Sequence, residues 1–177
     1  MIKYRITKYD PAKREEDGYY QLDDWISVSD IDKHIVTKEE YLFVENNYVA
    51  IIINIMEHLK IEGLKVNGLE KGFNLQRNIF ILSKYNIFLD KNQQYIFKTI
   101  KNNNYYHIKE IKSVVKLILR ECMWCRLVSP SVKFTFGYDY YMYFHSVTDF
   151  NFSLIQIPNG IYIEQYDEES QKYIYLK

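Results

Sequence analysis

The segment from Thr37 to about Lys60 constrains the fold more than any other part of the chain. Thr37-Lys38-Glu39-Glu40 has the pattern of a capping box, in which the Thr37 hydroxyl accepts from the Glu40 amide and the Glu40 carboxylate accepts from the Thr37 amide. We place Gly63 as the residue that stops this helix. Apolar residues form one stripe and widen it on both sides: Tyr41, Val44, Tyr48, Val49, Ala50, Ile51, Ile52, Ile53, Ile55, Met56 and Leu59. A helix that is apolar most of the way round must be covered on two sides, so we predict a central helix packed on a sheet.

Alternation of apolar and polar residues predicts the strands of that sheet. We expect strands at residues 2–9, 64–68 and 132–136, a bulge or bend at Gly137, and a further strand over 138–144 that buries Tyr138, Tyr140 and Met142. Residues 150–157 and 161–166 are expected to pair through an Asn159-Gly160 hairpin turn, and 172–176 to add an edge strand. Residues 19–29 are ambiguous between a short strand around Trp25 and a turn or cap at Ser29-Asp30.

A second helix is predicted from about Tyr106 to Arg126, ended by Ser129-Pro130 because a residue before proline avoids the helical region. Residues 73–106 are the least readable, with apolar runs of strand length at 79–82 and 87–89. Strands, helix, mixed region, helix and strands in that order predict one α+β domain over residues 1–177. Its expected architecture is two long helices packed on a mainly antiparallel sheet with a C-terminal meander.

Composition excludes several classes of protein. Lysine plus arginine number 23, as do aspartate plus glutamate, so the formal net charge is zero and argues against a nucleic-acid binder. There is no apolar leader at the start and no run able to cross a bilayer, which together with two cysteines predicts a cytoplasmic protein without membrane contact. No phosphate-binding glycine motif occurs, and we expect no cofactor.

The residues that commonly carry chemistry give weak signals. Cys122 and Cys125 have C-x-x-C spacing, but we expect them near a helix C-terminus, where the helix dipole does not lower a thiol pKa. A structural zinc needs four ligands, and no second pair with suitable spacing exists. We therefore expect two core cysteines, no metal and no catalytic residue. One alternative is a small enzyme with a pocket around Asp139, Tyr141, Tyr143 and His145.

Acidic residues beside aromatic ones are more suggestive. Carboxylates steer the encounter with a basic partner and aromatic side chains anchor it, although a charge run is usually a solvated face. The residues we expect at a partner-binding surface are Asp23, Asp24, Trp25, Glu164, Tyr166, Asp167 and Glu168.

Four blocks of the chain resemble a family of small bacterial proteins. The blocks are 3–11 (KYRITKYDP), 23–31 (DDWISVSDI), 119–125 (LRECMWC) and 136–143 (FGYDYYMY), and the family shares YRITKYNP, DEWTSxSDIG, LREExWCKL and FGYDYYMY in that order. Ile26 stands where threonine is usual, and Asp32 where glycine is usual. The family resembles immunity proteins of bacterial toxin systems, including contact-dependent growth inhibition.

The resemblance implies an immunity protein that binds and occludes the C-terminal domain of a cognate toxin, such as a nuclease. Two alternatives remain open. One is an interaction or accessory protein outside toxin systems, which could form a homodimer through its C-terminal edge strand. The other is the small enzyme described above.

Overall fold

An antiparallel sheet of eight strands organises the computed structural model, which describes residues 1–15, 20 and 24–176. The strands are β1 (Ile2–Thr7), β2 (Gly63–Glu70), β3 (Tyr105–His107), β4 (Trp124–Val128), β5 (Val132–Phe136), β6 (Met142–Ser146), β7 (Tyr162–Asp167) and β8 (Lys172–Tyr175). Their order across the sheet is β3-β2-β4-β5-β6-β1-β7-β8. The expected α+β class is confirmed. The N-terminal strand β1 lies between β6 and β7, so it interrupts the C-terminal series of strands.

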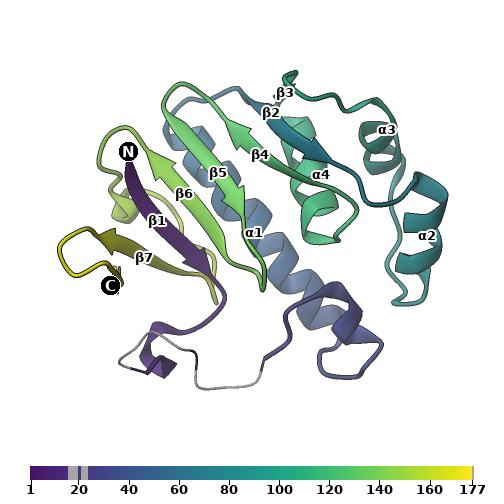
Figure 1. Ribbon diagram of the computed structural model, residues 1–177, viewed down its shortest axis with the longest axis horizontal. Coiled ribbons are helices and arrows are strands. Elements are labelled where there is room, and N and C mark those ends of the chain that lie inside the picture. Colours follow the sequence, from purple (N-terminus) through teal and green to yellow (C-terminus); the bar gives the residue numbers. More distant parts are fainter. Residues whose placement is uncertain (16–19, 21–23, 177) are drawn as a thin grey trace.

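Four α-helices accompany the sheet within the described residues: α1 (Lys38–His58), α2 (Leu75–Ser83), α3 (Lys91–Thr99) and α4 (Ile108–Leu119). Figure 1 shows α1 and α4 behind the sheet, with α2 and α3 beside the β2 end. Short 3₁₀ helices occur at Pro11–Lys13, Val28–Ile31 and Phe152–Leu154. The α-helices therefore cover one face of the sheet, and none of the α-helices in the described residues covers the other face.

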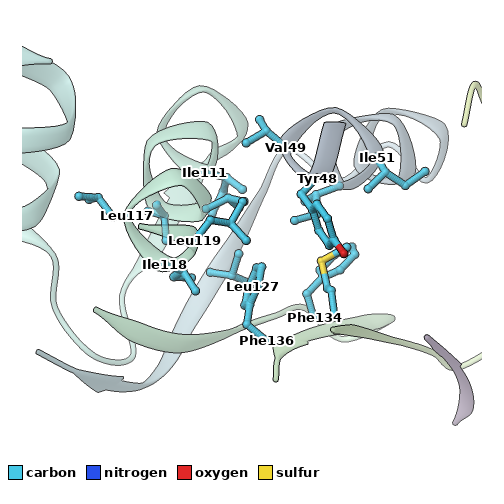
Figure 2. Packing of buried hydrophobic residues seen from close by; sticks show 14 of the residues in the cluster. Tyr48, Val49, Ile51, Ile111, Leu117, Ile118, Leu119, Leu127, Phe134 and Phe136 are labelled. Carbon is cyan, nitrogen blue, oxygen red and sulfur yellow. The ribbon is translucent and has the colours of Figure 1, made fainter. Parts of the chain in front are cut away.

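The hydrophobic core lies between α1, α4 and the sheet. Figure 2 shows Tyr48 of α1 and Leu119 of α4 pointing toward Phe134 and Leu127 of the strands. Strand alternation puts Tyr4, Phe134 and Phe144 fully inside, and the Phe144 ring contacts the other two. Burial of this apolar surface is the main stabilising contribution to the fold.

The predicted capping box at Thr37 is confirmed, but the predicted role of Gly63 is wrong. The helix α1 ends at His58, and Lys60 takes the left-handed conformation beyond it with φ 55°. Gly63 instead begins β2, where a Cβ atom would lie 2.3 Å from the carbonyl oxygen of Tyr106 on β3. Glycine is required there because two strands approach closely.

The second predicted helix is real but ends seven residues early. The helix α4 stops at Leu119, and the residues from Trp124 form strand β4. The prediction to Arg126 was wrong because Cys122 and Trp124 continue the apolar spacing of the helix, whereas Cys125 and Leu127 are buried at the two-residue spacing of a strand. Cys122 therefore lies in the turn after α4 and Cys125 in β4, both buried and free.

Several shorter predictions also change. Residues 79–82 belong to α2 rather than to a strand, and residues 150–157 contain a 3₁₀ helix instead of a strand. The Asn159-Gly160 turn exists, but only Gly160 has positive φ and no strand precedes it, so it is not a hairpin of type I′. Around Trp25 there is no strand among the described residues; a 3₁₀ helix follows, capped by Ser27 and Asp30. The edge strand at the C-terminus is confirmed.

Candidate functional site

A cavity of about 690 Å³ lies where the β5–β6 loop, the turn after α4 and the residues before the Val28 3₁₀ helix come together. Three of the four sequence blocks that carry the family resemblance contribute to its lining. The described lining residues are Ile26, Ser27, Tyr48, Glu70, Gly72, Ile118, Leu119, Glu121, Met123, Trp124, Phe136, Gly137, Tyr138, Asp139, Tyr140, Tyr141 and Met142. Segments far apart in sequence thus form one concave surface.

The β5–β6 loop reverses through a turn with two left-handed residues. Asp139 and Tyr140 have φ 57° and 58°, and the Tyr141 amide donates to the Tyr138 carbonyl at 3.2 Å. Positive φ at both central residues defines a type I′ turn, which usually takes Asn-Gly. A tyrosine in this conformation is strained unless its surroundings hold it.

Tyr140 is held by the core. Its ring contacts Trp25, Tyr41 and Tyr48, and its hydroxyl donates to the Leu119 carbonyl at 3.1 Å. The Tyr48 hydroxyl also donates to the Tyr140 carbonyl. The turn that buries Tyr140 leaves Tyr138 92% exposed beside the cavity. The expected burial of Tyr138 was therefore wrong, while that of Tyr140 and Met142 is confirmed.

The turn after α4 places a carboxylate in the same cavity. The Glu121 amide donates to the Ile118 carbonyl and the Cys122 amide to the Leu117 carbonyl, both at 2.9 Å, which is the Schellman pattern. Glu121 occupies the left-handed position of that motif with φ 59°, where glycine is usual. Desolvation raises the pKa of Glu121, the nearby Asp30 raises it further, and the Val28 amide partly opposes both.

The lining combines an apolar floor with acidic groups. Ile118, Met123 and Phe136 provide apolar surface, and the Trp124 indole nitrogen donates to the Phe136 carbonyl at 2.8 Å. Glu70, Glu121 and Asp139 line the cavity, whereas no lysine or arginine is among its described lining residues. Such a site suits a group with an apolar stem and a cationic or hydrogen-bond-donating end.

Some residues of the predicted partner-binding surface are buried in the structure. Asp23 lies outside the described residues. The Asp24 carboxylate forms an ion pair with the Lys8 ammonium at 2.7 Å. Trp25 is 7% exposed, with its ring against Tyr41 and the Lys8 ammonium 4.2 Å from its centroid. Trp25 is thus a core residue rather than an exposed anchor.

Glu164 is also buried, contrary to its assignment to an exposed acidic surface. Its carboxylate accepts two hydrogen bonds from Arg5, at 2.7 and 2.8 Å, and lies 3.2 Å from the Arg14 guanidinium. Two arginines therefore neutralise it from β1 and from the segment after it. A carboxylate held in this way does not steer a basic partner.

The other predicted contacts lie at the β7–β8 turn. Tyr166 is half-buried between Tyr173 and the Lys3 ammonium. The Asp167 carboxylate accepts from the amides of Glu169 and Ser170 and so shapes the turn, and Glu168 is exposed. No described contact joins this turn to the cavity, and a role for it in partner binding stays a prediction.

Only two of the four residues of the enzyme alternative line the cavity, although Tyr141 also lies within electrostatic reach of Tyr143. Asp139 and Tyr141 line the cavity, but Tyr143 and His145 are not among its described lining residues. They lie on β6, where Tyr143 pairs with Thr135 and Arg5 and His145 with Lys133 and Lys3. Those four groups do not form one site in the described structure.

Other candidate chemistry finds little support in the described residues. Burial raises the pKa of both thiols, Cys122 and Cys125, to about 12, so neither is a reactive thiolate. Within the described ranges, no group of three His, Cys, Asp or Glu side chains is placed to hold a metal ion. None of the helices in that part of the chain has the length and apolar character needed to cross a membrane.

Sequence reasoning missed Tyr138, Glu121 and Glu70 as members of one site. The available signal was the FGYDYY block: two consecutive non-glycine residues after Gly137 form the turn. The sequence predicted a bend at Gly137, but not that Asp139 and Tyr140 would form a left-handed turn that interrupts the strand expected over 138–144.

Comparison with known proteins leaves the cavity as the main guide to function: no family model, no curated protein and no solved structure matches this chain.

Proposed function

We propose that this chain is an immunity protein, which binds a cognate bacterial toxin domain and neutralises it by occlusion. The proposal rests on the resemblance of four sequence blocks to that class, and one observation carries it further. Three of those blocks meet at a single cavity, beside which a strained turn holds Tyr138 almost fully exposed.

The cavity suggests how the partner is recognised. Tyrosine is enriched among residues that dominate binding energy, because it brings a large apolar surface and a polar tip at low entropy cost. Tyr138 would pack on the toxin while Glu70, Glu121 and Asp139 receive a lysine or arginine side chain from it. Basic residues are abundant in nuclease active sites that bind phosphates, so carboxylates would compete for them. An interface of roughly 800 Å² on each partner is the usual size for such a complex.

The test is to co-express this chain, in the cytoplasm of a sensitive strain, with a toxin domain taken from a reading frame next to its gene. The wild-type chain is expected to restore growth and to co-purify with the toxin. Tyr138→Ala is expected to weaken the complex by about tenfold or more, equivalent to about 1.4 kcal/mol.

Tyr95→Ala is the matched control, because Tyr95 is 63% exposed on α3 and is not a lining residue of the cavity. It should leave both readouts unchanged. Failure of the wild-type chain to rescue or to bind would refute the immunity function. Equal binding by the Tyr138 and Tyr95 variants would refute the assignment to this cavity.

A second candidate is an accessory protein that dimerises through β8. This strand lies at one edge of the sheet, and Ile174 and Tyr175 on it are 52% and 38% exposed. An exposed edge strand can pair with a second copy. A mass measured during size-exclusion chromatography distinguishes monomer from dimer. Because the Leu176 amide donates to Ile163 on β7, the amide of Tyr175 points to the free edge, so Tyr175→Pro should abolish a dimer of this kind.

A further inference from the structure

The face of the sheet opposite α1 and α4 carries an unusual row of basic side chains. Along each strand, residues that alternate with the buried ones point to this open face. Lys133 on β5 lies directly opposite His145 on β6, and His145 lies directly opposite Lys3 on β1. Figure 1 shows these strands in front of the two helices, with the open face toward the reader.

The row continues to the other side of the sheet. Lys133 pairs with Val128 on β4, and Val128 pairs with Lys65 on β2. We call Lys65, Lys133, His145 and Lys3 the basic row. Neighbouring strands lie about 4.8 Å apart, so the three lysines follow one another across the sheet at every second strand, with Val128 or His145 between them.

Acidic residues do not balance the basic row. On the open face of β4, β5, β6 and β1, the described residues include Arg126 and Arg5 as further cations but no carboxylate. The carboxylate next along is Glu164 on β7, which already binds Arg5 and Arg14. None of the ion pairs seen in the described chain involves Lys3, Lys65 or Lys133.

No two lysines of the row stand directly opposite each other, because Val128 or His145 lies between each two, but no carboxylate separates them either. Their field is visible at His145: burial lowers the pKa of its imidazole, and Lys133, Lys3 and the N-terminal amine lower it further, although the Lys133 backbone opposes this.

Tyrosines stand at both ends of the row. Tyr105 on β3 pairs with Lys65 and is 53% exposed. At the other end the Lys3 ammonium lies 5.0 Å from the centroid of the Tyr166 ring, and Tyr166 contacts Tyr173 on β8. A linear set of cations bounded by aromatic rings matches an extended strand of phosphates and bases, because bases stack on aromatic side chains while lysines neutralise phosphates.

We propose that the open face of the sheet binds single-stranded nucleic acid along the basic row. This site is separate from the cavity and goes beyond toxin binding. The zero net charge of the chain does not oppose it, since alternation along the strands segregates the cations onto one face. An acidic protein is the other polyanion that this face would attract, but it would not require tyrosines at the two ends of a line.

The test is fluorescence anisotropy of the full chain with labelled single-stranded DNA and RNA oligonucleotides at several salt concentrations. The logarithm of the association constant is expected to fall linearly with the logarithm of the salt concentration. Each phosphate contact contributes about −0.7 to the slope of that line. The double variant Lys3→Gln/Lys133→Gln should reduce the slope by about 1.4 and weaken binding at low salt. The control Lys109→Gln/Lys112→Gln removes two exposed lysines from α4, on the helical side, and should change neither value.

Three results would overturn the proposal: no binding at low salt, equal loss with both double variants, or tighter binding of a polyglutamate peptide than of either oligonucleotide. Tyr138→Ala serves to separate the two sites. It should leave oligonucleotide binding intact, so failure of toxin binding and failure of nucleic-acid binding can be told apart.

Discussion

Arg120 and Glu45 form a buried, two-pronged ion pair between the end of α4 and the middle of α1. The guanidinium donates to the two carboxylate oxygens at 2.6 and 2.8 Å, and Glu45 is fully buried. Arg120 also donates to the Phe88 carbonyl and to the Gln93 side chain, both at 3.1 Å. Burial lowers the pKa of Arg120, but the hydrogen bonds and the charge attraction to Glu45, with smaller contributions from Tyr41 and Cys122, together outweigh this and the net shift is upward. One side chain therefore joins α1, α4 and the segment that leads into α3.

Arg120→Met is expected to destabilise the fold by about 3–5 kcal/mol, because it leaves the Glu45 carboxylate buried with only Lys116 nearby. The Lys116 ammonium is 3.7 Å away and cannot replace two hydrogen bonds. Urea unfolding measures the loss. Arg77→Met, at an exposed position of α2, is the control and should stay within about 0.5 kcal/mol of wild type. A smaller loss for Arg120→Met/Glu45→Met than for Arg120→Met alone would show that the unpaired charge is the cause; a larger one would contradict it.

Asp30 should make stability depend on acid pH. Its buried carboxylate accepts from the Ile26 and Ser27 amides at 2.8 and 3.0 Å and from Lys33 at 2.9 Å. Burial alone would raise the pKa of Asp30, but these donors lower it below the ordinary 3.8. A carboxyl with a lowered native pKa stabilises the fold above its unfolded pKa, and this contribution is lost as pH falls through the native value.

The free-energy difference between wild type and Asp30→Asn should therefore be constant at neutral pH and shrink below about pH 4. Chemical unfolding at a series of pH values gives the difference directly. Glu40→Gln is not a suitable control, because that carboxylate also caps a helix. Glu168→Gln, at an exposed turn, is suitable. If the difference in unfolding free energy between wild type and Asp30→Asn keeps its size in strong acid, the pKa of Asp30 is not lowered by folding.

Cys122 and Cys125 should be unreactive in the native protein. Burial raises the pKa of each thiol to about 12, so almost no thiolate is present in mildly alkaline solution. An excess of a thiol reagent such as dithionitrobenzoate should modify neither residue until denaturant unfolds the chain. Rapid modification of one thiol without denaturant would show that the turn after α4 opens readily.

Local signals predicted what local interactions determine. Thr37 and Glu40 are three residues apart, and the capping box between them forms as expected. The end of α4 was not predictable in this way, since pairing of β4 with β2 and β5 decides the conformation of Trp124–Val128. The burial of Trp25 and Glu164 likewise depends on partners such as Tyr41 and Arg5, which are distant in the sequence.

The same limit applies to charge. Lys3, Lys65 and Lys133 lie in three separate parts of the chain, so neither a run of basic residues nor the net charge signals them. Sheet order and register bring them onto one line. The cavity is similar, since its acidic groups come from β2, the turn after α4 and the β5–β6 loop.

Two helix ends offer a matched test of whether Glu121 is retained for binding. Lys60 follows α1 and Glu121 follows α4, and both occupy the left-handed position of a Schellman motif, with φ 55° and 59°. Glycine adopts this conformation without the steric penalty of a side chain. Lys60→Gly and Glu121→Gly should therefore each stabilise the fold by up to about 1 kcal/mol. Removing Glu121 adds to this effect at neutral pH, because its raised pKa means that the ionised form is disfavoured in the native state.

The two variants should differ in binding. Lys60 does not line the cavity, so under the proposed function Lys60→Gly should bind a toxin as wild type does, whereas Glu121→Gly should bind it more weakly although the protein is more stable. Thermal unfolding and co-purification, measured on the same preparations, separate the two effects. Unaltered toxin binding by Glu121→Gly would show that Glu121 is not part of the binding site.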